Sequence, residues 1–214
     1  AALSTLLPAV LEGCVRYLSA PGPRVFAPEV RTALELAEVY PGDAGVLAAL
    51  LLNRLTLEPG QGLFLDAGNL HAYLRGVGVE IMANSDNVLR GGLTPKHVDV
   101  PELMRVLEFA PLADPTVQPV PATRGVPGEV DYPTPEPDFA LSRITLEAGD
   151  RSVSWRPEGP EVLLCTAGVT TVSVGEYDDE LRAGGAYWVP ASTDEVVLAS
   201  TDGATIFRTR VGDR

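Results

Sequence analysis

The sequence predicts a mainly β protein that begins with a helical segment, and three observations indicate this class. Over residues 1–52 apolar side chains recur at helical spacing. From residue 53 the period changes to two, and short apolar stretches alternate with glycine-rich turns. After residue 138 seven short strands follow at near-regular spacing. This arrangement is typical of a jelly roll or barrel rather than of a parallel α/β sheet.

The helical segment divides into three helices. The first ends at the Ser-Ala-Pro-Gly-Pro run of residues 19–23, because proline and glycine there cannot continue it. The second covers residues 28–40 and stops at a Pro-Gly pair. Asp43 is suited to cap the N-terminus of the third, which we expect over residues 44–52.

The stretch from residue 53 to residue 111 reads as the first β region. We expect strands around residues 55–57, 63–66, 71–73 and 77–82, separated by turns, and one more helix over residues 101–109. Residues 112–137 are rich in proline and are predicted to form an extended linker or surface arm.

The second β region covers residues 138–214 and is predicted to form a small sandwich or barrel. Its expected strands are residues 141–146, 152–156, 162–166, 170–174, 187–189, 196–199 and 205–211. The predicted domain scheme is therefore a helical segment (1–52), a first β region (53–111), a linker (112–137) and a second β region (138–214).

Composition limits the classes of partner. The 214 residues carry a formal net charge of −13, which argues against nucleic acid or an anionic membrane as the main partner. No apolar run reaches the roughly 18 residues that a membrane span requires. The two cysteines match no disulfide or zinc-finger spacing, which favours a reducing, cytoplasmic compartment. The chain starts with Ala1 in what reads as a helix, so we expect the natural N-terminus to lie upstream.

His71 is the first candidate for chemistry. It follows a Gly-Asn turn at the start of an expected strand, where it would share one face with Tyr73. A neutral imidazole at the mouth of a barrel can bind Zn²⁺, Fe²⁺ or Mn²⁺. The alternative is an ordinary hydrogen-bonded histidine at a strand end. The other histidine, His97, lies in a polar loop and is interpreted as solvated.

A charged series follows in the next loop. Arg90 and Lys96 are the residue types that hold a phosphate, and Gly91–Gly92 would let a ligand approach the backbone. Asp86 lies in a Ser-Asp-Asn turn and could equally cap backbone amides in a purely structural loop. Glu80 could act as a base or ligand, or could lie on a solvated strand face.

Several other catalytic signatures are missing from the sequence. It contains no G-x-S-x-G elbow, P-loop, G-x-G-x-x-G segment after a strand, or H-E-x-x-H helix. Neither cysteine has a neighbouring histidine, so thiol catalysis has no support.

A resemblance adds to these observations. The segments YPGDAGV, LLLNRLTLEPGQGLFL, GNLHAYL and VEIMANSDNVLRGGLTPK, running from Tyr40 to about residue 100, resemble type I mannose-6-phosphate isomerase. The resemblance implies a cupin-type jelly roll, of which residues 53–111 form the second part, and a cupin-like C-terminal domain without metal. It also implies a zinc-dependent isomerisation of mannose 6-phosphate and fructose 6-phosphate through an enediol.

The same resemblance assigns roles to individual residues. His71 matches a zinc ligand and Arg90 an active-site arginine. Lys96, Tyr73, Asp86 and Glu80 fall on positions that line or support the substrate site.

The match covers the C-terminal half of the family. The family's remaining zinc ligands, a Gln-x-His pair and a Glu, belong to an N-terminal half that this chain lacks. We therefore expect the chain to be inactive alone and its barrel to be completed by that half, while its retention of zinc stays open. The rival interpretation is a non-catalytic cupin module that binds sugar phosphates or a partner subunit.

Overall fold

The computed structural model describes residues 2–84, 88–149 and 151–212. The chain forms two compact units, and each is built from several segments. The first unit comprises the described residues of Ala1–Thr56, Asp66–Leu74 and Asp86–Pro111, and the second comprises those of Leu57–Leu65, Arg75–Ser85 and Leu112–Arg214. The chain therefore passes between the units repeatedly, whereas the sequence pattern predicts successive, contiguous regions.

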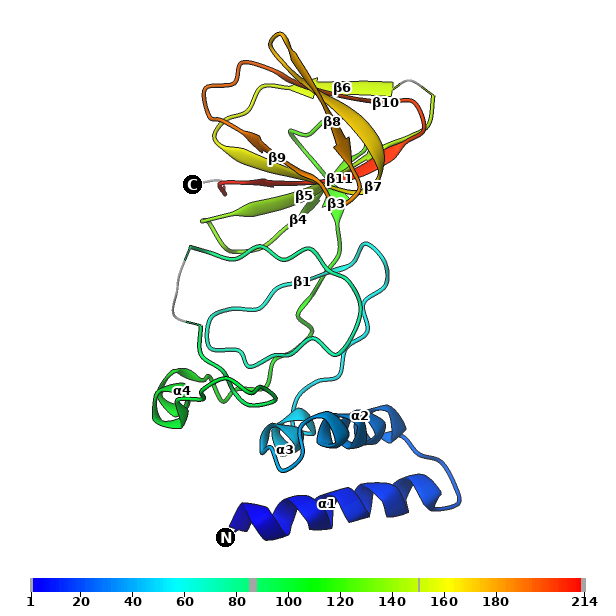
Figure 1. Ribbon diagram of the computed structural model, residues 1–214, viewed down its shortest axis with the longest axis vertical. Coiled ribbons are helices and arrows are strands. Elements are labelled where there is room, and N and C mark those ends of the chain that lie inside the picture. Colours follow the sequence, from blue (N-terminus) through cyan, green and yellow to red (C-terminus); the bar gives the residue numbers. More distant parts are fainter. Residues whose placement is uncertain (1, 85–87, 150, 213–214) are drawn as a thin grey trace. The chain divides into compact units, whose positions relative to one another are not determined.

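The first unit contains four helices. They are α1 (Ala2–Ser19), α2 (Ala27–Val39), α3 (Gly45–Ala49) and α4 (Val100–Val106). The three N-terminal helices are confirmed, although the third ends at Ala49 and not at residue 52. The fully or nearly fully buried core between them is Leu7, Ala33 and Val46. α1 packs on α2 and α2 packs on α3, as Figure 1 shows.

The short helix α4 confirms the helix expected after residue 100. The Asp99 carboxylate accepts a hydrogen bond from the Glu102 backbone N–H at 3.1 Å, which satisfies one of the unpaired amides of the first turn. Pro101 in that turn has no N–H to leave unsatisfied. None of the described helices is long and apolar enough to cross a membrane.

The second unit is a mainly antiparallel β structure. Its strands are β1 (Gly62–Leu63), β2 (Thr116–Val117), β3 (Val120–Pro121), β4 (Glu129–Tyr132), β5 (Ala140–Leu146), β6 (Arg151–Trp155), β7 (Glu161–Val174), β8 (Tyr177–Arg182), β9 (Ala186–Val189), β10 (Val196–Ser200) and β11 (Ala204–Arg210). β1 pairs with β2, and the larger sheet runs β3-β4-β5-β11-β7-β10-β6 with β8 and β9 also paired to β7.

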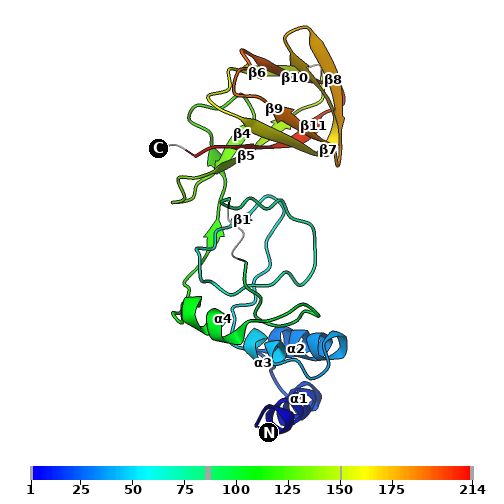
Figure 2. The same ribbon diagram turned by 60° about the vertical axis from the view of Figure 1, so that its left-hand side comes forward.

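The long strand β7 makes this sheet curl into a half-barrel. Its first half pairs with β11 and β9, and its second half pairs with β10 and β8 (Figures 1 and 2). Gly168 lies between the halves with φ 73°, and the register with β11 shifts between Thr205 and Ile206. The curled sheet encloses an apolar core that includes Ile144, Leu163, Leu198 and Ile206, all fully buried.

Most strands of the second β region are where the sequence predicts them. The expected strands 162–166 and 170–174 are one continuous strand, β7. β8 was not predicted because its sequence, YDDELR, is mainly charged, and most of its side chains are exposed. The proline-rich stretch 112–137 contains the short strands β2, β3 and β4, and Tyr132 at the end of β4 is buried.

The first β region is the main correction. Among its described residues only β1 is a strand, so His71 does not begin one and the alternating residues 77–82 do not pair. A strand requires a neighbour for its backbone hydrogen bonds, and alternation alone cannot supply one. Many apolar residues of this stretch remain exposed, among them Leu55, Leu57, Leu74, Val77 and Met82.

Candidate functional site

The turn that carries His71 is held against the end of α4. The Asn69 side-chain amide donates to the Asp66 carbonyl at 3.0 Å, and the Glu108 N–H donates to the Gly68 carbonyl at 3.1 Å. Gly68 has φ 83°, and a Cβ there would lie 2.9 Å from the Val106 carbonyl oxygen. Only glycine meets both requirements without strain, which explains the glycine two residues before the Leu-His pair.

The His71 imidazole is arranged for a ligand on one nitrogen. Nδ1 lies 3.1 Å from the Asn69 carbonyl oxygen, which can only accept, so we assign the proton to Nδ1. Nε2 then carries the lone pair that a metal ion would bind. The side chain is exposed, and the Tyr73 ring lies edge-on to it with centroids 6.1 Å apart.

Residues 88–96 form the loop that carries Arg90 (the Arg90 loop). This loop lies against the turn of residues 67–71 (the His71 turn) in the same unit. A Cβ on Gly91 would overlap Leu70 Cδ1, so the backbone beside Arg90 packs directly on the residue that precedes His71. Arg90 itself is half-buried. The packing brings together two segments about twenty positions apart in sequence. It also explains why residue 91 is a glycine, since any larger residue would overlap Leu70.

A residue given only a capping role by the sequence anchors this loop. The N-cap of α3 is Ala44 and not Asp43, which lies one residue earlier. The Asp43 carboxylate nevertheless accepts from the Gly45 N–H at the start of α3, and it also accepts from the Leu93 N–H fifty residues away. Local sequence gives no signal for that second bond. The nearest signal is the Gly91–Gly92 pair, which indicated a close approach but not its partner.

The remaining predicted residues are less defined. Lys96 is exposed, and its N–H donates to Thr94 Oγ1 at 3.2 Å. Glu80 is exposed and belongs to the second unit, so it is not placed with His71. Asp86 lies outside the described residues. His97 is exposed, in agreement with its interpretation as a solvated side chain.

A zinc site needs more ligands than the described residues supply. No group of three or more His, Cys, Asp or Glu side chains in the described part of the chain is placed to hold a metal ion. Structural and catalytic zinc ions take three or four protein ligands, and His71 can provide one. These residues alone therefore do not fit the ion.

Both thiols are poor nucleophiles. Burial raises the pKa of Cys14 and of Cys165 above the usual value, so both stay protonated near neutral pH. This agrees with the lack of support for thiol catalysis in the sequence.

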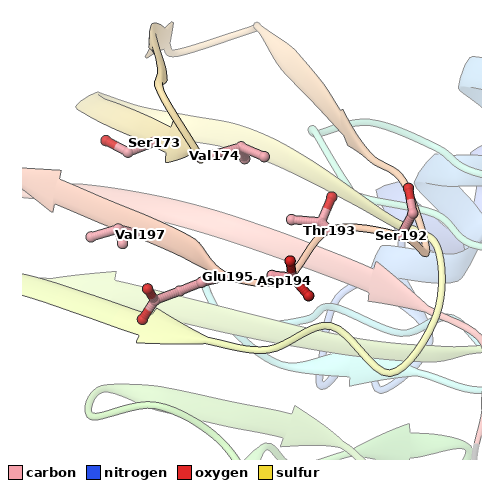
Figure 3. Close-up of a pocket in the computed structure, with 8 residues that line it drawn as sticks. Ser173, Val174, Ser192, Thr193, Asp194, Glu195 and Val197 are labelled. Atoms are coloured by element: carbon pink, nitrogen blue, oxygen red, sulfur yellow. The ribbon is translucent and has the colours of Figure 1, made fainter.

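The second unit contains a polar hollow of about 500 Å³ at one end of β7 (Figure 3). Ser173, Thr193, Asp194 and Glu195 are among its lining residues, and neither histidine contributes. Asp194 forms an exposed ion pair with Arg156 at 3.4 Å. The hollow contains no residue that the sequence singled out for chemistry.

A buried ionic network also lies in the second unit. Arg208 Nε and Nη2 donate to the two Glu161 carboxylate oxygens at 2.9 and 2.6 Å, and Nη1 donates to Glu129 at 3.3 Å. The Trp155 indole N–H donates to Glu161, and its ring lies 4.6 Å from the guanidinium carbon. Burial would lower the pKa of Arg208, but the hydrogen bonds and charges of Glu161 and Glu129 outweigh it and raise that pKa. The network is satisfied within the protein and is therefore structural.

Comparison with known proteins identifies relatives. No protein-family model matches the chain. It is 38% identical over 163 residues to mannose-6-phosphate isomerase of Escherichia coli, covering 76% of this chain and 41% of the relative. It is 40% identical over 185 residues to the enzyme of Cryptococcus neoformans, covering 85% of this chain and 42% of the relative.

Comparison with solved structures identifies the same family of relatives. A point mutant of phosphomannose isomerase from Salmonella typhimurium matches with a TM-score of 0.80 and 33% identity, over 98% of this chain and 51% of that one. The enzyme from the same organism bound to its substrate and zinc matches with a TM-score of 0.77 and 33% identity, over 100% and 50% of the two chains. The resemblance stated from the sequence is confirmed: the chain is a type I phosphomannose isomerase homologue that spans about half the length of the relatives it matches.

Proposed function

We propose that this chain is the C-terminal half of a zinc-dependent, cytoplasmic aldose–ketose isomerase that interconverts mannose 6-phosphate and fructose 6-phosphate. The observation that carries the proposal is the match at 33% identity and a TM-score of 0.77 to an isomerase structure bound to substrate and zinc. The packing of the Arg90 loop on the His71 turn supports it, because it groups the two residues whose roles the resemblance implies.

In this proposal His71 contributes one zinc ligand through Nε2. The other ligands come from residues outside this sequence, since the chain spans 41% of the Escherichia coli relative and its described residues hold no ligand set. The Asn69 carbonyl would keep the ring in the tautomer that binds metal.

The reaction moves a proton from C2 of the open-chain sugar to C1 through an enediol. Arg90 would stabilise the negative charge that develops on the enediolate oxygens, because a fixed guanidinium beside them lowers the barrier without reorganising. Lys96 would hold the phosphate as an exposed point charge. Tyr73, Glu80 and Asp86 are proposed to line or support the substrate site.

The exposed apolar residues of the first β region fit the same proposal. We propose that residues 53–111 are the second part of a catalytic cupin barrel and that strands from the other half pair with them. Residues such as Leu55, Leu57 and Val77 are exposed in this chain and would then become buried. Residues 138–214 are proposed to form a cupin-like domain without metal.

The test compares this chain with the complete protein that contains it. We expect about one zinc ion and isomerase activity for the complete protein, and no turnover for this chain alone. Full turnover by the chain alone would contradict its proposed dependence on the other half. A complete protein that binds fructose 6-phosphate but neither binds zinc nor turns it over would favour the non-catalytic module.

A further inference from the structure

The Asp43 carboxylate joins two backbone segments that are far apart in sequence. Oδ1 accepts from the Gly45 N–H at 2.7 Å and Oδ2 accepts from the Leu93 N–H at 2.9 Å. A carboxylate has two oxygens, and here each serves a different segment. The first bond satisfies the backbone N–H of Gly45, the first residue of α3, while the second ties the loop after Arg90 to the helices.

One residue of the tied loop, Leu93, has an unfavourable backbone conformation. Leu93 has φ 53°, and it is the non-glycine residue with positive φ in the described chain. Such a conformation costs an L-residue free energy and persists only where its surroundings impose it. The Asp43 bond to its N–H and the packing of the Leu93 side chain on the helical core are the two restraints that do so.

The segments around Gly45 and Gly92 are packed closely against each other. A Cβ on Gly92 would lie 2.9 Å from Asp43 Oδ1, and a Cβ on Gly45 would lie 2.8 Å from Leu93 Cγ. Gly92 also has φ 120°, which glycine alone adopts readily. The two backbones are therefore in direct contact at Asp43, and Arg90 lies three residues from the tied amide.

A hollow of about 430 Å³ borders Asp43, and Tyr40 and Thr94 also line it. The bonds that the structure shows for this carboxylate are one backbone amide on each oxygen. Its chemistry is that of a tether.

We propose that Asp43 is a positioning residue for Arg90, fixing the Gly91–Leu93 backbone so that the guanidinium is held beside the His71 turn. The inference rests on the proposed function only for the consequence in catalysis, since the tether itself is a property of this chain. Asp43 touches neither substrate nor reacting atoms in this scheme and acts through the loop.

Asp43→Ser separates the two bonds. A serine hydroxyl can still accept from the N–H two residues on and so keep the bond to Gly45, but it lacks the second oxygen that reaches Leu93. Asp99→Ser is the matched control, because the Asp99 carboxylate also accepts from a nearby backbone amide in the first turn of a helix, α4.

The experiment uses the complete protein. Hydrogen exchange of a peptide spanning residues 88–96 is expected to become about tenfold faster in Asp43→Ser and to stay unchanged in Asp99→Ser. The kcat for isomerisation is expected to fall about tenfold in Asp43→Ser. In an Arg90→Ala background the same substitution should change kcat less than about twofold, because the residue it acts through is already gone.

Two results would overturn the inference. Unchanged hydrogen exchange of residues 88–96 in Asp43→Ser would show that Asp43 does not restrain the loop. An undiminished loss of kcat in the Arg90→Ala background would show that Asp43 does not act through Arg90. If the wild-type protein fails to isomerise, the proposed function fails instead. The exchange data and the same Arg90 cycle, measured on the Kd for fructose 6-phosphate, then decide the tether separately.

Discussion

Carboxylates organise both the curled sheet of the second unit and the His71–Arg90 loops of the first, but they do so in opposite ways. In the sheet, Glu161 and Glu129 both bind the Arg208 side chain, Glu129 also accepts from the Val126 N–H, and the three charged residues are buried. In the loops, Asp43 binds two backbone amides and leaves Arg90 and His71 for other contacts. A network closed on itself therefore builds a rigid element, whereas a backbone tether can fix a loop without consuming its functional side chains.

The strongest effect is expected at the His71–Arg90 loops. If the proposed function holds, His71→Ala in the complete protein should lower isomerase kcat/KM by at least about 100-fold and reduce the zinc content, because the proposed metal ligand is lost. Metal analysis and initial rates measure this.

His97→Ala is the control for that substitution, since His97 is exposed in the same unit and has no proposed ligand role. Its rate and zinc content should match those of the wild type. Equal zinc in His71→Ala and wild type would contradict the ligand assignment.

The next largest effect, on stability, is expected from a substitution that disrupts the buried network of the sheet. Arg208→Ala should lower the free energy of unfolding by about 3–5 kcal/mol, because it leaves two buried carboxylates without their cation. Urea unfolding followed by tryptophan fluorescence reports it, since Trp155 belongs to the network.

The exposed pair in the same unit supplies the comparison. Arg156→Ala should change stability by no more than about 0.5 kcal/mol, because its bond to Asp194 is largely solvated. Similar losses for the two variants would mean that burial of the Arg208 network contributes nothing.

A smaller effect concerns the bend in β7. Gly168→Ala should cost about 2–3 kcal/mol, because φ is 73° and the new Cβ would overlap the Gly203 carbonyl oxygen. Gly175→Ala, with φ 61° and no atom within 4 Å of the new Cβ, should cost about 1 kcal/mol. Thermal unfolding compares them, and equal shifts would show that close backbone packing at the bend is unimportant.

The weakest effect concerns Gly60, which lies in the segment Leu57–Leu65 shortly before the His71 turn in sequence. The Tyr132 hydroxyl donates to the Gly60 carbonyl at 2.9 Å, so Tyr132→Phe should cost about 1 kcal/mol. The exposed Tyr177→Phe should be neutral when assayed in the same way. A neutral Tyr132→Phe would indicate that water replaces the hydroxyl without loss.

Prediction from sequence succeeded where local pattern and tertiary contact agree. The helices ending at the Pro-Gly turns and the strands of the curled sheet were predictable because their apolar period matches the face that they bury. Leu163 and Ile206 illustrate this, since each belongs to an alternating strand and is fully buried. β8 was not predictable in this way, because it pairs with β7 through its backbone and Leu181 is its single buried side chain, which gives no apolar alternation.

The candidate site divides along the same line. His71 and Arg90 were proposed from their residue types and their segment, and the Gly-Asn turn before His71 was predicted where it lies. The Asp43 bond to Leu93 and the Glu129–Glu161–Arg208 network were not, because the bonded partners are 47 to 79 residues apart.

The sequence alone was enough to predict the helices, most strands of the sheet and the relationship to the phosphomannose isomerases, and it proposed the residues that could carry chemistry. The folded chain was needed to show that residues 71–82 are irregular, that Gly91 packs on Leu70, and that one carboxylate, Asp43, holds the Arg90 loop. The two kinds of information differ because periodicity and turn chemistry act between neighbours in sequence. A backbone hydrogen bond to a distant partner depends on which segments the fold brings into contact.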